Sequence, residues 1–420
     1  MALAGSQSDS GCAWISLWRS FQVRVAVVHG TAHPLPVRLP SVHRAFASLL
    51  FLSAAALAED GFTPLFNGRD LAGWVDINCA PETFVATNGI VHCTGFPTGI
   101  LRTERMYQNF VLEAEWRHLK PKGNSGIYVW ADPVPAVGQP FVRAVEVQVL
   151  DGLEGDGFTS DGDIFPIHGA KMVAENNRKG GDRAFPTEKR MKPSPEWNHY
   201  RVECIDGDIS LAVNGKVVTR GHRATPRKGY IGLEAEGSPA EFRNLRVKEL
   251  PAAASLAPED IAVPPEGFRP LYTGVDLRGW TVAAGASAPW KPDDWQLTSA
   301  ATTGAPMVSS GEFGDGELLF DWRWTDAKQP GDWMKLVQFR RLDLPVLLAR
   351  ASAAKPAEAA AGKWNRVRIS IRGNRVSVTL NDHPLLTDVT AAQVPARGVI
   401  EVRAATVPTQ LANLLFKPLD

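Results

Sequence analysis

The chain has 420 residues, of which 44% are hydrophobic, with 45 basic and 45 acidic side chains. That length is enough for two or three domains with separate cores, and the zero net charge gives no reason to expect nucleic acid or an anionic membrane as a partner. No run of about 20 apolar residues occurs, so the sequence predicts no membrane-spanning helix.

The N-terminal segment contains the pattern of an export signal, displaced from Met1. Residues 1–41 show no helical or strand periodicity, and we expect them to be disordered and to result from an over-extended gene start. Residues 42–58 begin with a short basic stretch, continue as an apolar run and end in Ala56-Leu57-Ala58, which is typical of a secretory signal peptide. The apolar run is too short for a membrane anchor. We therefore expect cleavage after Ala58 and a secreted or periplasmic protein.

Residues 141–151 contain a strictly alternating strand pattern. Three valines alternate with Glu146 and Gln148. Side chains in a β-strand point alternately to the two faces of its sheet. The valines are therefore expected in the core, and the polar pair on the opposite face, in solvent or in a groove.

Residues 124–130, just upstream, repeat this pattern. Ile127 and Val129 alternate with Tyr128 and Trp130. Two such strands in one sheet would place aromatic rings beside a carboxylate and an amide. Many sugar sites have this composition, because rings stack on the apolar face of a pyranose and polar groups bind its hydroxyls. The simpler interpretation is a solvated sheet face with exposed aromatic residues.

The sequence around these two predicted strands also favours an all-β domain. Short alternating segments are separated throughout by Gly, Asn and Pro turns. Ile209–Val213 and Lys216–Thr219 flank Asn214-Gly215, and Asn-Gly suits the type I′ turn of a β-hairpin. Short antiparallel strands over the length of a whole domain predict a β-sandwich or barrel.

The opening motif of the domain returns in the second half of the chain. Residues 61–74 (GFTPLFNGRDLAGW) and 267–280 (GFRPLYTGVDLRGW) are identical at most positions, and further landmarks recur in the same order. The chain therefore contains a duplicated domain. We place copy one at residues 59–250, copy two at residues 267–420, and a Pro/Ala-rich linker at residues 251–266.

The two copies differ in the segment that carries the polar pair. Copy two is shorter there, and its residues 334–339 contain Gln338 but no acidic side chain; we expect them to correspond to the Glu146 strand. Copy two is therefore predicted to be non-catalytic. Trp74 and Trp280, which close the repeated motif, should be equivalent core residues.

Both copies resemble the 3-keto-disaccharide hydrolase domain family. The residues that carry the resemblance in copy one are 61–74, Gly123–Ile127, Glu146–Asp151, Glu196–Asn198, Asn214-Gly215, Gly229–Leu233 and Phe242–Leu245. The resemblance covers residues 61–250 well and 267–420 more weakly. It implies an all-β protein with two tandem concanavalin A-like β-sandwich (jelly-roll) domains. It also implies an exported protein that acts on glycosides oxidised to a ketone at C3.

The chemistry of such a substrate defines what a site would need. A ketone at C3 acidifies the C2 proton, and the glycosidic oxygen at C1 lies β to the resulting carbanion. A base can therefore take the C2 proton while the aglycone leaves, and water then adds to the enone. This requires a general base, a group that polarises the C3 oxygen and a proton donor for the leaving group. A pair of carboxylates, as in ordinary glycosidases, is the alternative arrangement.

The candidate catalytic residues are Glu146, Asp151, Asp163 and His168. Glu146 is the preferred base, because partial burial beside aromatic rings would raise its pKa. Asp151 could instead begin a turn before Gly152. His168 could be an ordinary loop histidine.

The candidate substrate-binding residues are Asn124, Tyr128, Trp130, Gln148 and Lys171. Gln148 lies one pleat from Glu146 and could orient a sugar hydroxyl. Lys171 belongs to a segment that copy two lacks, and could instead be a solvated charge.

No cofactor is predicted from these motifs. One acidic cluster could hold Ca²⁺, because hard oxygen ligands gather there, although its spacing matches no Ca²⁺ loop signature. Its members are Asp151, Glu154, Asp156, Asp161 and Asp163. Export would also permit a disulfide between Cys79 and Cys93, which only their geometry can decide.

Three functions are compatible with these patterns. The preferred one is a secreted enzyme that hydrolyses or eliminates the glycosidic bond of 3-keto-glycosides on copy one. The alternative is a non-catalytic, lectin-like protein of the cell envelope, in which two linked glycan sites would gain avidity. The third is an envelope scaffold. The first two predict a saccharide or glycoside as partner.

Overall fold

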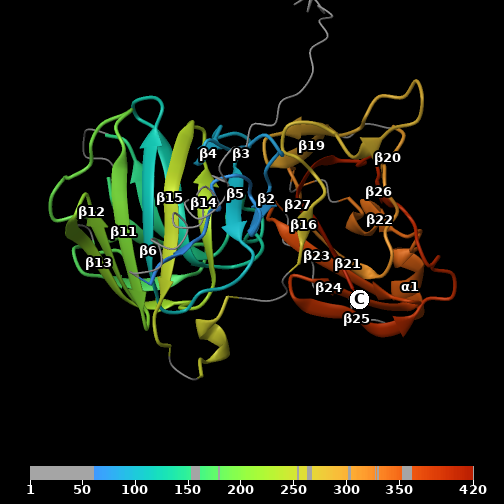
Figure 1. Cartoon of the computed structure of the whole chain (residues 1–420). Coiled ribbons are helices and arrows are strands. Elements are labelled where there is room, and N and C mark those ends of the chain that lie inside the picture. Colours follow the sequence, from blue (N-terminus) through green and yellow to red (C-terminus); the bar gives the residue numbers. More distant parts are fainter. Residues whose placement is uncertain are drawn as a thin grey trace, which may run out of the picture. The chain divides into compact units, whose positions relative to one another are not determined.

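The computed structural model describes residues 61–152, 161–177, 180–252, 255–262, 267–300, 304–326, 328, 331–351 and 362–419. Their regular secondary structure is almost entirely antiparallel β-strand (Figure 1). The predicted all-β class with two tandem β-sandwich domains is confirmed. The expected leader, residues 1–58, lies outside the described residues.

Copy one begins with a nine-stranded sheet. Its strands pair in the order β10-β13-β12-β11-β6-β15-β4-β3, and β1 also pairs with β15. The bounds are β1 (Thr63–Pro64), β3 (Phe84–Thr87), β4 (Ile90–Cys93), β6 (Phe110–His118), β10 (Lys171–Ala174), β11 (Asn198–Ile205), β12 (Asp208–Val213), β13 (Lys216–Thr225) and β15 (Ala240–Glu249). The predicted Asn214-Gly215 hairpin joins β12 to β13. Both of its turn residues have positive φ, 47° and 88°, as a type I′ turn requires.

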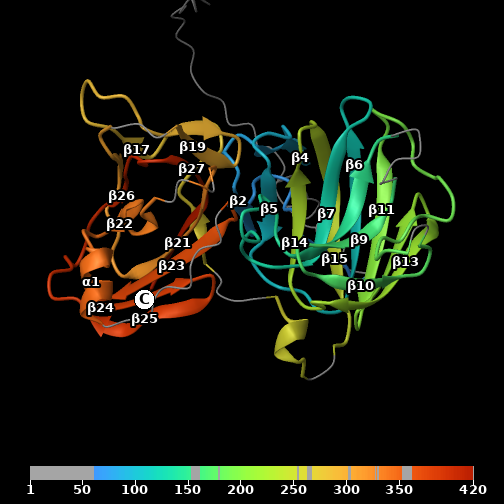
Figure 2. The ribbon, with the colours of Figure 1, turned by 180° about the vertical axis from the view of Figure 1, so that it is seen from behind.

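The second sheet of copy one has six strands. Their order is β2-β5-β14-β7-β8-β9, and Figure 2 shows β5, β14 and β7 side by side. The bounds are β2 (Trp74–Ile77), β5 (Gly99–Thr103), β7 (Asn124–Ala131), β8 (Ala144–Leu150), β9 (Ile164–Ile167) and β14 (Tyr230–Ala235). Ile127, Val129 and the three valines of β8 all join the buried core, together with residues of the nine-stranded sheet. The alternation predicted for these two strands therefore identifies their core face correctly.

Copy two repeats this plan with fewer strands. Its larger sheet has eight strands in the order β18-β19-β27-β21-β23-β24-β25, with β16 paired to β27, and its smaller sheet runs β17-β20-β26-β22. The larger sheet contains β16 (Arg269–Pro270), β18 (Lys291–Asp293), β19 (Gln296–Ala300), β21 (Gly316–Trp324), β23 (Asn365–Arg372), β24 (Arg375–Leu380), β25 (His383–Thr390) and β27 (Pro408–Pro418). The smaller one contains β17 (Trp280–Thr281), β20 (Met307–Ser309), β22 (Val337–Phe339) and β26 (Ile400–Val402).

Three short helical segments accompany the strands in the described residues. Two are 3₁₀-helices, η1 (Pro258–Asp260) and η2 (Trp333–Lys335), and one is the α-helix α1 (Leu344–Arg350). The side chain of Asp343 caps α1 by accepting a hydrogen bond from the Val346 N–H, which satisfies one of the donors exposed at a helix start. No helix of the described residues is both long and apolar enough to cross a membrane.

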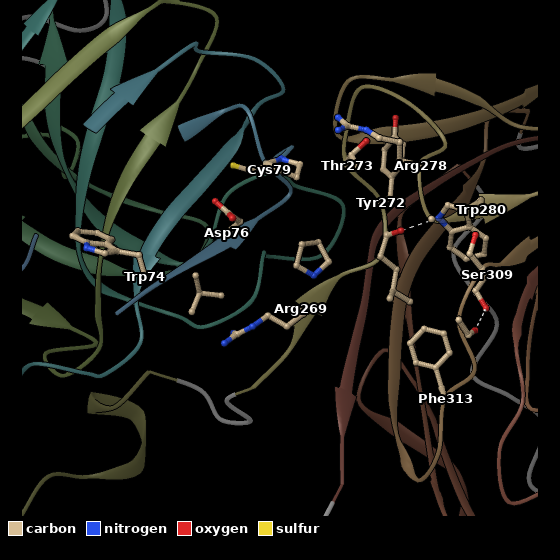
Figure 3. Close-up of a pocket in the computed structure, with 17 residues that line it drawn as sticks. Trp74, Asp76, Cys79, Arg269, Tyr272, Thr273, Arg278, Trp280, Ser309 and Phe313 are labelled. Carbon is tan, nitrogen blue, oxygen red and sulfur yellow. Dashed lines mark hydrogen bonds between the residues drawn. The ribbon is translucent and has the colours of Figure 1, made fainter. Parts of the chain in front are cut away.

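Equivalent bonds in the two copies confirm the duplication. The indole of Trp74 donates to the Leu65 carbonyl at 2.8 Å, and that of Trp280 donates to the Leu271 carbonyl at 2.8 Å (Figure 3). Both rings are buried. The prediction that these two tryptophans are equivalent core residues is therefore correct.

Candidate functional site

Strand β7 lies between β14 and β8 and brings the candidate residues together. Tyr128 of β7 is paired with Glu146 of β8 on one side and with Gly232 of β14 on the other, and Gly126 is paired with Gln148. These side chains occupy the sheet face opposite the valine core. Glu146 and Gln148 therefore lie on the face that the alternation of β8 predicts, but both are buried and do not lie in solvent.

Gly126 allows two carboxylates to approach each other across the strand. A Cβ at this position would lie 2.9 Å from Oε1 of Glu146 and 3.0 Å from Oε2 of Glu234. Contacts that short are not tolerated, so any side chain at position 126 would push the carboxylates aside. The missing side chain creates the space that the two acids share.

A network of hydrogen bonds joins the carboxylates to amides and a phenol. The Tyr128 hydroxyl donates to Oε1 of Glu234, and the Asn124 amide donates to Oε2 of Glu236. Gln148 donates in turn to Oδ1 of Asn124 at 2.7 Å. Each of these bonds ties an acid or amide to a strand of the rigid sheet, so the site is held in place before any substrate arrives.

Burial raises the pKa values of the three glutamates, and repulsion from neighbouring carboxylates raises those of Glu146 and Glu234 further. Glu146 is only 6% exposed, and its desolvation, together with the charge of Glu236, raises its pKa from 4.5 to about 8. Burial and the neighbouring carboxylates raise the pKa of Glu234 well above its ordinary value, and burial also raises the pKa of Glu236. Like charges this close cannot all ionise at neutral pH, so the group retains protons there.

One cation lies beside these acids. The Arg183 guanidinium covers the ring of Phe165, 3.3 Å from its centroid, and pairs with the buried Asp163 at 3.1 Å. Phe165 is the β9 partner of Glu146. The charge of Arg183 favours the ionised form of Glu146 and so limits the rise of its pKa. Asp163 therefore belongs to this site, where it fixes the cation.

The prediction that Trp130 lines this face is wrong. Its backbone has a φ of 52°, and the β7–β14 register shifts between Tyr230 and Gly232. This irregularity reverses the direction of the side chain, because a bulge interrupts strict alternation. The Trp130 ring joins the core and donates its N–H to the Gln108 carbonyl at 2.8 Å.

Lys171 and Asp151 also lie elsewhere. Lys171 is exposed on β10, in the nine-stranded sheet, where it is paired with Thr225. Asp151 is an odd number of residues from Glu146 and turns to the other side, where it accepts a hydrogen bond from the Ser194 N–H at 3.3 Å and lines a cavity of about 480 Å³.

His168 lies at the far end of β9. The preceding Ile167 is paired with Ala144, and the His168 ring packs against Phe141 with 6.4 Å between ring centroids. Burial lowers the pKa of His168, which favours a neutral ring. The structure thus separates His168 from Glu146 along the strand.

The sequence also suggests a Ca²⁺ site and a disulfide between Cys79 and Cys93. Within the described residues, no group of three or more His, Cys, Asp or Glu side chains is arranged to hold a metal ion. Two members of the suggested Ca²⁺ cluster, Glu154 and Asp156, lie outside the described residues. Cys79 and Cys93 are both buried free thiols, so the suggested disulfide is not formed.

Sequence reasoning missed Glu234, Glu236 and Arg183. The two glutamates follow the closing motif Gly229–Leu233 and alternate with Ala235, so their shared face could have been predicted. What the pattern could not show is that β14 lies beside β7, because that pairing joins residues about 100 positions apart.

Within the described residues, copy two has no equivalent of this carboxylate group. Strand β22 pairs with β26 as β7 pairs with β14, so Gln338 takes the place of Tyr128, not that of Glu146 as predicted from sequence. The described part of this sheet contains no strand beyond β22. Arg403, five residues after Gly398, stands where copy one has Glu234, and it donates to Gln338 at 2.7 Å.

A separate cavity of about 560 Å³ is less suited to acid–base chemistry. One acidic side chain, Asp76, lines it, together with Arg269 and Arg278 (Figure 3). Burial raises the pKa of Asp76 to about 6. A single acid cannot supply both a base and a proton donor, whereas the glutamates around Gly126 can.

Comparisons with known proteins support a carbohydrate-active, hydrolase-like protein. Residues 61–248 and 267–413, which make up more than half of the chain, match the family described as the 3-keto-alpha-glucoside-1,2-lyase-like domain. The chain belongs to this family and contains two copies of its domain.

Individual relatives are more distant. A 3-keto-disaccharide hydrolase of Bacteroides thetaiotaomicron is 26% identical over 242 residues, which cover 46% of this chain and 79% of the relative. A solved structure from Parabacteroides distasonis, named as a candidate glycosyl hydrolase, is 22% identical with a TM-score of 0.36 and covers 46% of this chain and 95% of its own. A carbohydrate-binding module from Bacillus subtilis, CBM66, is 12% identical with a TM-score of 0.30, over 42% and 96%.

Proposed function

We propose that copy one cleaves the glycosidic bond of 3-keto-glycosides, with Glu146 as the base that removes the C2 proton. The observation that carries this proposal is the position of Glu146: buried on the sheet face opposite the valine core, with a pKa raised to about 8 and two further glutamates beside it. A base with a pKa near the working pH combines a useful ionised fraction with a strong affinity for the proton.

The electron pairs and protons of this reaction balance as follows. Glu146 accepts the C2 proton, and the C–H electron pair moves toward the C3 oxygen to form an enolate. The enolate then expels the aglycone from C1, and a protonated carboxyl supplies the proton that the leaving oxygen needs. Water adds to the resulting enone at C1 and completes the hydrolysis. The proton that water loses goes to the carboxylate that protonated the leaving oxygen. Glu146 returns its proton to C2, which restores both carboxyl groups.

Other residues of the site can fill the remaining roles. Glu236 is less buried than Glu234 and is held by Asn124, so we assign it the proton transfer to the leaving oxygen. The positive charge of Arg183 lies close enough to Glu146 to affect its pKa and would stabilise the negative charge that develops at the C3 oxygen. Gln148 and Asn124 would bind ring hydroxyls.

The direct test compares aglycone release from a 3-keto-glucoside or 3-keto-trehalose by the wild type and by Glu146→Gln. The substitution keeps the size of the side chain and removes its basic oxygen, so we expect turnover to fall by about 10²–10⁴-fold with little change in substrate affinity. Glu175→Gln, which alters an exposed glutamate beside His222, is the matched control and should leave the rate unchanged.

Three results would contradict the proposal. Full activity of Glu146→Gln would transfer the role of base to another acid. Absence of aglycone release by the wild type from every 3-keto-glycoside, combined with measurable binding, would favour the lectin-like alternative. Cleavage of ordinary glycosides at a comparable rate would indicate the two-carboxylate mechanism of common glycosidases.

A further inference from the structure

Strands β7 and β8 continue beyond their sheet as a hairpin tip, residues 132–143. Within the tip, the Asp132 N–H donates to the Arg143 carbonyl at 2.8 Å, and the Ala136 N–H donates to the Phe141 carbonyl at 2.9 Å. The side chains of Asp132 and Arg143 also form an ion pair at 3.0 Å. These bonds extend the strand pairing, so the tip is a continuation of the two strands that carry the carboxylate site.

Copy two presents three buried polar side chains to this tip: Asp321 of β21, Arg366 of β23 and Asn413 of β27. Arg366 donates to both oxygens of Asp321, at 2.7 and 2.8 Å, and Asn413 donates to the same carboxylate at 2.7 Å. Their bonds to the tip include those from the Gly138 N–H to Asp321 (2.8 Å), from Arg366 to the Pro135 carbonyl (2.8 Å) and from Asn413 to the Gln139 carbonyl (3.0 Å).

Gly138 shows how closely the tip approaches copy two. Its φ is +65°, a conformation that L side chains rarely adopt, and a Cβ there would lie 2.0 Å from Cγ of Trp364. Only glycine fits this position. The close approach is therefore specific to the sequence of the tip, and a single methyl group would prevent it.

The buried ion pair makes this contact difficult to loosen. A buried charge is tolerated when hydrogen bonds satisfy it, and an unsatisfied buried polar group is costly. Backbone groups of the tip provide some of the bonds that Asp321 and Arg366 make. A shift of the tip would leave these groups without those bonds.

The tip also contacts the site. The Phe141 ring packs edge-on against the Tyr128 ring, with 6.1 Å between their centroids. Tyr128 donates its hydroxyl hydrogen to Glu234, whose carboxylate shares the space over Gly126 with Glu146. The position of Phe141 thus sets that of Tyr128, and through it that of Glu234.

We propose that copy two is a positioning domain: its Asp321–Arg366–Asn413 cluster holds the β7–β8 tip and so fixes the geometry of the carboxylate site in copy one. The kinetic part of this inference rests on the function proposed above; the structural part does not. Copy two therefore contributes to catalysis without a site of its own. It also follows that only those residues of copy two that contact the tip should affect the site.

The test uses the whole protein with Arg366→Met and Gly138→Ala, and with Arg340→Met as the matched control. Arg340 is also buried in copy two but bonds to Asp315 and to the Pro395 carbonyl, away from the tip. Amide hydrogen exchange is measured in residues 132–143, together with kcat and KM on a 3-keto-glucoside. We expect Arg366→Met and Gly138→Ala to accelerate exchange in the tip by about tenfold or more and to lower kcat by about tenfold or more.

The control and the possible outcomes distinguish the positioning role of copy two from the catalytic function proposed for copy one. Arg340→Met should destabilise copy two without changing exchange in the tip. Gly138→Ala alters no residue of copy two, so it remains informative even if Arg366→Met fails to fold. Unchanged tip exchange in Gly138→Ala would overturn the positioning role, and so would faster exchange with unaltered kcat in an active enzyme. A wild type without activity would refute the proposed function, while the exchange result would still decide whether copy two holds the tip.

Discussion

At the level of single residues, the carboxylate site depends on Gly126 as much as on its acids. We predict that Gly126→Ala lowers turnover by about tenfold to 10²-fold, because a Cβ 2.9 Å from Glu146 and 3.0 Å from Glu234 must displace both carboxylates, and a misplacement of about 1 Å can cost that much. The measurement is aglycone release at saturating substrate. Gly311→Ala, where a Cβ would meet nothing within 4 Å, is the control and should behave as the wild type.

The titration of Glu146 gives a second prediction at this scale. Its pKa in the folded protein, about 8, lies above the ordinary 4.5, so the folded chain binds this proton more tightly than the unfolded chain. The resulting stabilisation is complete below about pH 4.5 and is lost as the pH rises to about 8. Turnover requires the ionised form, so kcat/KM should rise with pH toward a midpoint near 8, which belongs to the coupled group of glutamates.

The pH dependence of thermal stability tests the titration of Glu146 independently of the reaction rate. In Glu146→Gln the pH-dependent loss of thermal stability between about pH 4.5 and about pH 8 should be smaller than in the wild type, because the neutral amide has no proton to lose. A rate profile that rises near pH 4.5, as for an exposed glutamate, would show that Glu146 is not the base.

How much of the site the sequence predicts depends on the range of the interactions. Alternation along one strand correctly places Glu146 and Gln148 on a common face. It fails at Trp130, because a bulge with positive φ is a property of the strand pairing and not of the local sequence. It also cannot show that Glu234 reaches Glu146, since that contact requires the pairing of β14 with β7.

At the level of elements, the strand order explains why copy two lacks the site. The small sheet of copy two matches β2-β5-β14-β7 strand for strand and ends at β22 within the described residues. The position of the Glu146 strand therefore has no counterpart there. The shorter length of copy two predicts that part of the site is lost. It does not show which strand is missing, and the sequence pattern therefore matches Gln338 to the wrong strand of copy one.

This strand order leads to the prediction for Gln338→Ala. Gln338 interacts with Arg403 and with the Leu342 carbonyl inside copy two, and it does not belong to the cluster that holds the tip. Sites without shared partners behave additively, so turnover on a 3-keto-glucoside should stay within roughly threefold of the wild type. A larger loss, with unchanged exchange in residues 132–143, would show that copy two takes part in the reaction by another route.

At the scale of the whole molecule, the two copies carry different parts of the arrangement that we propose. Copy one retains β8, β9 and the glutamates. Copy two retains the larger sheet, whose β21, β23 and β27 carry the polar cluster that contacts the tip. The sequence predicts the duplication from repeated motifs, but not this division of roles, because Asp321, Arg366 and Asn413 are scattered along the chain and meet only in the folded sheet.

Export of the protein is our remaining proposal, and its thiols provide a test. Cys79, Cys93 and Cys204 are buried and free; burial raises the pKa of Cys93 to about 12 and those of the other two well above the ordinary value. A thiol reacts as its thiolate, so these three should be inert in the native protein at pH 8 and react with a thiol reagent only on unfolding. The full sequence contains four cysteines, the fourth being Cys12. Protein collected from the native host's periplasm or medium should therefore begin at Glu59 and show three reactive thiols in denaturant. A fourth reactive thiol, or a peptide from residues 1–41, would show that the segment before Ala58 is retained.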